Sequence, residues 1–274
     1  MVAFLFWNIH GNKHAFAFIG RLAVTYRIDV LFLAECPKEV DELLAVLNQT
    51  GRGIYRIADR GITKVRGITR LPESDFFPHF NNLKGDMTVW NLAADDPGKV
   101  RMQVAVVHLL SKAGGATEAD QQAVATEISR EIAEYEDNEG CQDTLLVGDL
   151  NMNPWEPGMV LVSGFHASMT KRLADLPDRE WRKEKYRRFY NPMWGLFGDR
   201  TPGPPGTHFW ESSITSNHHW HMVDQVLLRP CLINRLRNIQ ILDRDGYESL
   251  VGPSGAATKE YLSDHLPILF QMDS

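Results

Sequence analysis

Residues 143–154 read DTLLVGDLNMNP, and this stretch decides the fold class. The run from Thr144 to Val147 is apolar or β-branched and stops at Gly148 and Asp149. A short apolar run bounded by turn formers is typical of a strand that is buried on both faces. We therefore expect a central strand that carries polar side chains at its carboxyl end.

Three other segments share this plan of an apolar run that stops at a polar residue. They are VAFLFWN at 2–8, DVLFLAE at 29–35 and VAVVH at 104–108. Apolar residues recur at helical spacing in residues 14–28 and again in residues 38–49, which predicts two helices. A third helix is predicted from about Thr117 to Asn138, with Thr117 as its N-cap.

From Gly51 to Val107 the helical pattern gives way to short alternating segments between Gly, Pro and Asp, which we interpret as an antiparallel meander. The end of the chain adds three short strands, MVDQVLL at 222–228, NIQIL at 238–242 and HLPILFQM at 265–272. Early alternation of strands with helices, followed by mostly strands, favours a mixed-sheet α/β sandwich over a doubly wound parallel sheet.

The least regular stretch covers residues 154–217 and contains GDRTPGPPGTHFW. Strand-like sequence resumes directly after it, so this stretch predicts an elaborated loop rather than a linker between domains. We expect a single domain over residues 1–274 that carries an irregular insertion at about 154–217.

The composition is that of a folded protein, with 43% hydrophobic and 23% charged residues among 274. A formal net charge of -6 excludes a general polycationic coat for nucleic acid, although it allows a local basic patch. The three cysteines are too few and too scattered for a disulfide framework or a zinc knuckle. The opening MVAFLFWNIHGN has neither the basic region nor the apolar length of a signal peptide. We expect a cytoplasmic protein with no membrane segment and no disulfide partner.

Polar residues stand at the ends of the predicted strands. In a mixed sheet, the carboxyl ends of some strands lie beside the amino ends of their antiparallel neighbours, so such residues can meet at one rim. Carboxylates and carboxamides dominate the set, and these oxygen ligands suit Mg²⁺ or Mn²⁺ rather than zinc. Asp149 and Asn151 can both face one phosphate, with Gly148 allowing a close backbone approach. The rim set is Asn8, Glu35, His108, Asp149, Asn151, Asp224, Asp264 and His265.

The motifs around these residues resemble those of the endonuclease/exonuclease/phosphatase superfamily, which is also called DNase I-like. The resemblance implies a four-layer α/β sandwich, in which two mixed, mainly antiparallel sheets pack face to face with helices outside. It also implies metal-dependent cleavage of a phosphodiester or phosphomonoester. The matching segments follow the family's order between residues 4 and 270: WNIHG, LAEC, VHL, GDLNMNP, MVDQVLL and SDHLP.

The resemblance implies a metal centre in which Glu35 is the principal ligand. Asn8 and Asp264 then lie nearby in the metal shell. Asp149 orients or deprotonates the attacking water, and Asn151 holds that water or a phosphate oxygen. Both residues are therefore also candidates for the metal site, which we expect to bind Mg²⁺ or Mn²⁺.

The resemblance also implies a catalytic pair of histidines. His265 contacts the scissile phosphate, and Asp224 lies behind it, where a carboxylate fixes the tautomer of an imidazole and raises its pKa. His108 is then the second catalytic histidine. Apurinic endonucleases of the exonuclease III kind usually carry Tyr at the position of His108. Inositol-phosphate phosphatases typically carry a Cys-Asp-Arg run where this chain has Met222, Val223 and Asp224. This chain matches neither pattern.

A basic segment favours nucleic acid as the substrate. Residues 171–188 contain eight basic and four acidic residues, and four aromatic residues follow by position 197. Basic side chains can follow phosphates while aromatic rings stack on bases. The expected contact residues are Arg182, Lys183, Arg187, Arg188 and Tyr190. A nuclease is therefore our main interpretation, with a soluble phosphatase and a catalytically inert binding module as the alternatives.

Overall fold

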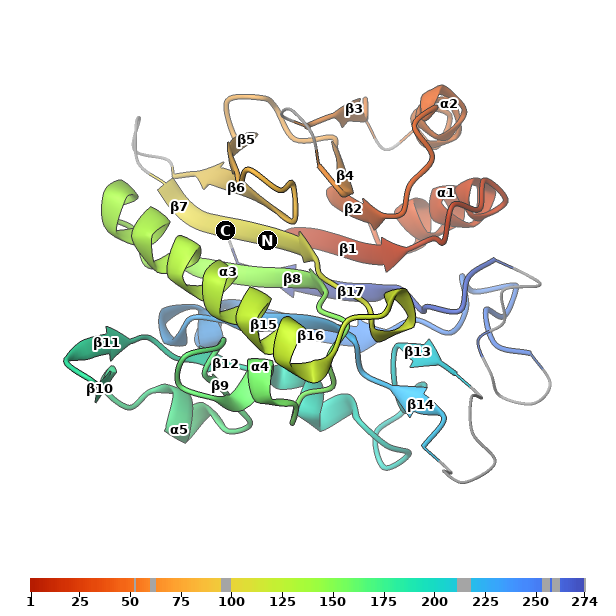
Figure 1. Cartoon of the computed structure of the whole chain (residues 1–274). Helices are drawn as coiled ribbons and strands as arrows, with labels where there is room; N and C mark the ends of the chain where they lie inside the picture. Colours follow the sequence, from red (N-terminus) through yellow and green to blue (C-terminus); the bar gives the residue numbers. More distant parts are fainter. Residues whose placement is uncertain are drawn as a thin grey trace.

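Two β-sheets lie face to face between helices in the computed structural model (Figure 1). The structure describes residues 1–51, 53–59, 63–94, 100–210, 218–252, 257 and 262–273. Helices α1 and α2 cover one sheet, and the long helix α3 covers the other. The predicted four-layer α/β sandwich is confirmed.

The first sheet has six strands, of which β1 and β2 are parallel and the other neighbouring pairs are antiparallel. Helix α1 (Ala15–Thr25) connects β1 to β2, and α2 (Asp41–Asn48) follows β2. Both helices were predicted. The strands in spatial order are β16 (Leu236–Ile241), β17 (Ile268–Met272), β1 (Val2–Asn8), β2 (Val30–Ala34), β4 (Val65–Thr69) and β3 (Arg56–Ile57).

The second sheet has seven strands, in which β7 pairs with β8 and β12 with β9 in parallel. Helix α3 (Glu118–Glu139) connects β7 to β8, and Thr117 caps it through a capping box with Asp120, as its sequence predicted. The strands in spatial order are β5 (Phe76–Asn81), β6 (Met87–Ala93), β7 (Val100–His108), β8 (Thr144–Asp149), β15 (Asp224–Leu228), β12 (Phe189–Tyr190) and β9 (Ala167–Ser168).

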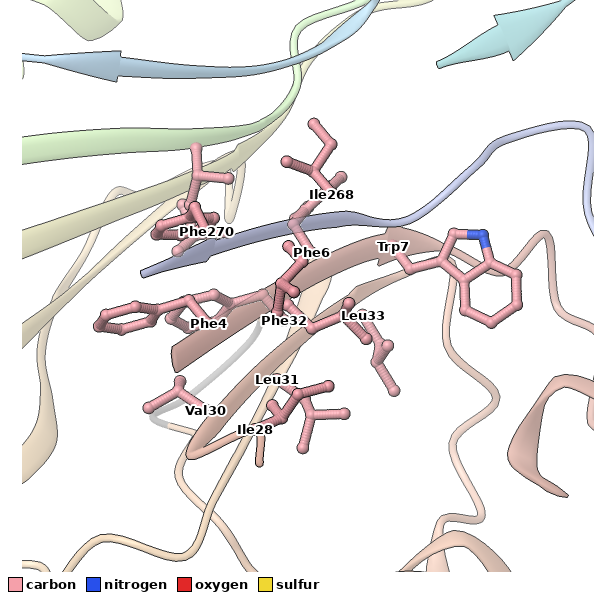
Figure 2. Close-up of a cluster of buried hydrophobic side chains, with 14 of the residues drawn as sticks. Phe4, Phe6, Trp7, Ile28, Val30, Leu31, Phe32, Leu33, Ile268 and Phe270 are labelled. Atoms are coloured by element: carbon pink, nitrogen blue, oxygen red, sulfur yellow. The ribbon is translucent and has the colours of Figure 1, made fainter. Parts of the chain in front are cut away.

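Both faces of the second sheet are buried, which explains why its strands are apolar without interruption. In β8, Leu145 and Val147 point into the core between the sheets, whereas Leu146 packs under α3. The core between the sheets is rich in aromatic rings (Figure 2), and Phe32 of the first sheet packs on Trp90 of the second with 5.0 Å between ring centroids. The sheets are therefore held in one fixed relation by close packing.

The expected meander of residues 51–107 is wrong in one respect, because its strands divide between the two sheets. β3 and β4 join the first sheet, whereas β5, β6 and β7 form the edge of the second. Gly67 of β4 then faces Trp90 of β6 across the core, where an added Cβ would lie 2.8 Å from the indole ring. Periodicity reports which residues are strand-like, but it does not report which sheet a strand joins.

The expected irregular insertion contains regular elements in its described part. β9 and β12 extend the second sheet, and two hairpins project from the body (Figure 1). Residues 211–217 of the insertion lie outside the described residues. The further elements here are α4 (Pro157–Val160), α5 (Lys171–Ala174), β10 (Arg179–Trp181), β11 (Glu184–Tyr186), β13 (His208–Phe209) and β14 (Trp220–His221).

No helix in the described part of the chain has both the length and the apolar character needed to cross a membrane.

Candidate active site

The strand ends meet at one rim, as the sequence predicted. Asn8 at the end of β1 pairs in register with Ala34, so Glu35 follows at the same level. His108 at the end of β7 pairs with Asp149 at the end of β8, and Asp149 pairs with Asp224 at the start of β15. The carboxyl ends of four strands therefore lie beside the amino end of a fifth.

The carboxamide of Asn8 bridges two carboxylates from different layers. Its Nδ2 donates to Glu35 Oε1 at 3.0 Å and to Asp149 Oδ2 at 3.1 Å. Its Oδ1 accepts a hydrogen bond from the backbone N–H of His10. Asn8 is only 1% exposed and lies behind the carboxylates, so its contacts are those of a residue that orients Glu35 and Asp149.

The left-handed backbone region is adopted by Glu35, directly after β2, and by Asn151, two residues after β8. Glu35 has φ 49° and Asn151 has φ 53°. This conformation costs a residue with a side chain on the order of 1 kcal/mol or more, and it is enriched at functional sites. Asn151 is fixed further by its backbone N–H to Asp149 Oδ1 and by its Nδ2 to the Leu109 carbonyl.

Imidazoles surround the carboxylates. His10 Nδ1 lies 3.3 Å from Glu35 Oε2, and His108 Nε2 lies 3.8 Å from both Glu35 Oε1 and Asp149 Oδ2. His208 Nε2 lies 3.5 Å from Asp264 Oδ2. Sequence analysis did not identify His208 as a site residue, because it lies in a Pro/Gly-rich loop without periodicity.

His265 and Asp224 form the predicted pair, with 2.8 Å between Nδ1 and Oδ2. Burial acts to lower the pKa of His265, but the charge and hydrogen bond of Asp224 outweigh burial and raise that pKa above its ordinary value. Burial raises the pKa of Asp224, because it disfavours the charged carboxylate. The pair therefore holds a proton at neutral pH, and His265 can donate an N–H from Nε2. Thr207 supports this arrangement by accepting the backbone N–H of Asp224.

A cavity of about 670 Å³ opens over these groups. Glu35, Asp149, Asn151, Asp264 and both predicted catalytic histidines line it. Gly148 does not serve this cavity, contrary to the expectation of a close approach to a ligand. An added Cβ there would lie 2.0 Å from the Val107 carbonyl oxygen, so the close approach is to the neighbouring strand β7.

The donor set fits a hard divalent cation. Within the described residues, Glu35 and Asp149 have imidazoles rather than Lys or Arg at ion-pair distance. Asp264 and Asp149 each also belong to a group whose ligand atoms lie within 4.8 Å of one another, and His265 is common to both groups. Clustered carboxylate oxygens suit a hard cation such as Mg²⁺ or Mn²⁺.

The predicted basic contact residues do not join this site. The hairpin of β10 and β11 lies at the opposite end of the sheets from the hairpin of β13 and β14, which borders the cavity (Figure 1). Arg182 and Lys183 are exposed at the tip of that distant hairpin, where Arg182 lies over the Trp181 ring. The expected substrate contact therefore fails at this cavity for Arg182 and Lys183. Further along the same segment, Phe197 packs beside His218, which lines the cavity.

Three of these residues have structural contacts instead. Arg187 pairs with Asp137 and with the buried Glu136, whose carboxylate also binds Arg229. Arg188 donates to the carbonyls of Leu176 and Pro177. Tyr190 pairs with Leu228 in the sheet and packs against the core. A cluster of charged residues in the sequence does not indicate which distant residues they pair with.

The sequence matches the model of one protein family. The model of the endonuclease/exonuclease/phosphatase family matches residues 5–265. The sequence matches no curated protein.

Solved structures with the same fold cover almost the whole chain. The catalytic domain of human nocturnin with bound sulfate has a TM-score of 0.57 at 14% identity, covering 99% of this chain and 94% of that one. An AP endonuclease from Archaeoglobus fulgidus has a TM-score of 0.56 at 13% identity, covering 100% of both chains. The 3′ phosphatase NExo from Neisseria, bound to a product DNA hairpin, has a TM-score of 0.52 at 15% identity and also covers 100% of both.

The pairing of Asp224 with His265 predicts a specific loss of rate. Asp224→Asn keeps the size of the side chain but removes the charge that holds the proton on His265. We expect the single-turnover rate on a phosphoester to fall at least about tenfold and at most about 10⁴-fold, which is the upper end of what a proton-transfer group contributes. Asp245→Asn, which removes a carboxylate paired with Arg21 away from the cavity, should leave the rate unchanged. A wild-type rate in Asp224→Asn would contradict the pairing.

Proposed function

Since the chain belongs to the endonuclease/exonuclease/phosphatase family, we propose that it is a Mg²⁺- or Mn²⁺-dependent phosphodiesterase that hydrolyses nucleic acid. One observation carries the proposal: the Glu35–Asn8–Asp149 bridge and the Asp224–His265 pair face the same cavity. The first supplies oxygen ligands for a cation, and the second supplies a proton donor for a phosphoryl oxygen. Phosphoester hydrolysis needs both.

The carboxylates and amides of the cavity have separate roles in binding the cation and orienting the water. Glu35 is the principal metal ligand, with Asp264 and Asn151 beside it and Asn8 orienting the carboxylates. When bound, a divalent cation neutralises charge on the phosphoryl oxygens. Asp149 orients the attacking water and accepts its proton. This assignment matches the place of Asp149 between Asn8 and the backbone N–H of Asn151.

The histidines act on the phosphate from two sides of the cavity. His265 donates from Nε2 to a phosphoryl oxygen, because Asp224 occupies its Nδ1. His108 serves as the second catalytic histidine, since its Nε2 lies at equal distance from Glu35 and Asp149.

The charge of the cavity supports a diester over a monoester. Among the described residues that line it, Lys112 is the one Lys or Arg, and it pairs with Glu156. A phosphomonoester carries a charge of about -2 near neutral pH, whereas a diester carries one negative charge. A cavity with few cationic side chains therefore suits the diester, and a soluble phosphatase acting on a small phosphoester is the second candidate.

Nucleic acid as the substrate has two further supports. The similar structures include one named as an AP endonuclease and one bound to a product DNA hairpin. The distant basic hairpin adds positive charge that a long polyanion can reach. Helix α3 runs from the site, where Gln121 binds the Asn151 carbonyl, to Arg187 beside this hairpin. Its 22 residues span about 33 Å at 1.5 Å per residue.

We also propose a cytoplasmic location. The three cysteines Cys36, Cys141 and Cys231 are free thiols, which is the usual state in a reducing compartment.

A panel of substrates tests the proposed function. Single- and double-stranded DNA, RNA and small phosphomonoesters are incubated at low salt with Mg²⁺ or Mn²⁺, and product is measured with and without EDTA. We expect turnover of nucleic acid that EDTA abolishes, because the donor set binds a cation. If small phosphomonoesters alone turn over, the protein is a phosphatase. Binding of nucleic acid without turnover of anything on the panel would favour an inert module.

The distant hairpin predicts a separate effect on salt dependence. Arg182→Gln with Lys183→Gln should lower the magnitude of the slope of log affinity against log salt by up to about 1.4, because each lysine or arginine on a phosphate of a single strand contributes about 0.7. The measurement is fluorescence anisotropy with a single strand of about 20 nucleotides, long enough to span α3. Hydrolysis of a dinucleotide should not change.

Arg187→Gln is the matched control in the same segment. It should lower the free energy of unfolding by roughly 1–3 kcal/mol, because the buried Glu136 loses one of its two arginines. It should leave the salt slope nearly unchanged. An unchanged slope in the Arg182 and Lys183 double variant would remove the hairpin from the substrate path.

A further inference from the structure

The cavity over the catalytic groups has two chemically different walls. The carboxylates, amides and catalytic histidines form one wall, which the proposed function uses. Four aromatic side chains that no catalytic step requires form another wall: His208, Trp210, His218 and His221. All four come from the hairpin of β13 and β14 or the residues next to it.

The hairpin places three of these side chains on the cavity side by strand alternation. His208 pairs in register with His221, and Phe209 pairs with Trp220. Successive side chains of a strand point to opposite faces. Phe209 and Trp220 accordingly contact each other at 5.4 Å and pack against the core, which leaves His208, Trp210 and His221 to the cavity.

The rings form a continuous series that starts at the reacting groups. The His208 ring lies 4.5 Å from the His265 ring, and the Trp210 ring follows at 6.4 Å with an angle of 14° to His208. His218 stacks on His221 at 4.8 Å with an angle of 29°. The His208 ring also lies 6.1 Å from the His221 ring, so the wall begins beside His265 and continues outward to Trp210 and to His218.

Trp210 presents the largest flat surface in this series. It is 44% exposed although it lies beside a deep cavity. A tryptophan buries 150–250 Å² when it is covered, so an exposed one at a substrate cavity is a strong site for a flat ligand. Its backbone N–H donates to the His219 carbonyl, which fixes the position of the residue.

The surroundings of His221 add little charge to this wall. Burial, and then the neighbouring His218 and His208, lower the pKa of His221 to about 4, so its ring is neutral at neutral pH. Asn153 Nδ2 lies 3.1 Å from His221 Nδ1 and holds the ring in place. A neutral, oriented ring suits stacking on a π-system better than binding a phosphate.

We propose that this aromatic wall is a nucleobase-stacking subsite, with Trp210 as the principal stacking residue for the base next to the scissile phosphate. The inference rests on the proposed function, because a base reaches this wall only when its phosphate lies over the catalytic groups. A base-stacking subsite restricts the substrate class to nucleotides that carry a base at the cleaved position. Sugar phosphates and abasic strands lack this base and should bind more weakly.

Equilibrium binding tests the subsite without requiring turnover. The probes are adenosine 5′-monophosphate and ribose 5-phosphate, each titrated in Mg²⁺ and followed by calorimetry. Base stacking on an aromatic side chain contributes about 1–3 kcal/mol, so the wild-type protein should bind the nucleotide about 5- to 150-fold more tightly than the sugar phosphate. Trp210→Ala should remove most of this preference, and Trp210→Phe should restore part of it.

Tyr247→Ala is the matched control, since it removes an aromatic ring that is 90% exposed and does not line the cavity. It should keep the wild-type preference. Equal binding of the two probes by the wild-type protein would overturn the inference, as would a full preference in Trp210→Ala.

Cleavage separates this inference from the proposed function. A single strand with its bases is compared with the same strand carrying abasic residues on both sides of the cleaved linkage. The wild-type protein should prefer the intact strand, and Trp210→Ala should cleave the two at similar rates. Equal wild-type cleavage of both strands overturns the subsite but leaves the nuclease. Preference for adenosine 5′-monophosphate without cleavage of any nucleic acid supports the subsite and overturns the nuclease.

Discussion

The site depends on one contact, the carboxamide of Asn8 between Glu35 and Asp149. Asn8 and Glu35 belong to the first sheet, whereas Asp149 belongs to the second. Two carboxylates this close repel each other unless donors or a cation lie between them. The bridge therefore requires both sheets to end at the same level, and the aromatic packing between the sheets supplies that constraint. A shift of either sheet would separate the metal ligands from the residue that orients the water.

The rest of the fold completes the cavity around this contact. β15 runs antiparallel to β8, and this direction brings Asp224 beside Asp149 and behind His265. The segment before β17 brings Asp264 and His265 to the rim, where an isolated bridge joins His265 to His208. The insertion then adds a wall of aromatic rings. A single cavity thus combines oxygen ligands, a proton donor and a flat aromatic surface, which is the combination that the proposed nucleotide substrate requires.

The sequence predicted most of the residues that meet at the rim, because the strands that lead to it end at or beside a polar residue. Asp149 and Glu35 follow uninterrupted apolar runs, so each was expected at the end of a strand. The packing of one sheet on the other is what brings these two strand ends together. The prediction failed where contacts span long distances in the chain. Arg187 pairs with a carboxylate 51 positions away, and nothing in the run of charge indicates that partner. His208 follows a Pro/Gly-rich stretch without periodicity, so the sequence did not predict its position. Its place at the cavity comes from the pairing of β13 with β14.

Cation binding measured directly by calorimetry tests the central claim that the Asn8 bridge holds a metal centre. The account predicts that the wild-type protein binds Mn²⁺ stoichiometrically. Glu35→Gln should weaken binding at least about 10- to 100-fold, because even residues that only support metal ligands contribute that much. Glu134→Gln, which removes an exposed carboxylate on α3, should leave the affinity unchanged. Wild-type Mn²⁺ affinity in Glu35→Gln, in a protein that is still folded, would contradict the account.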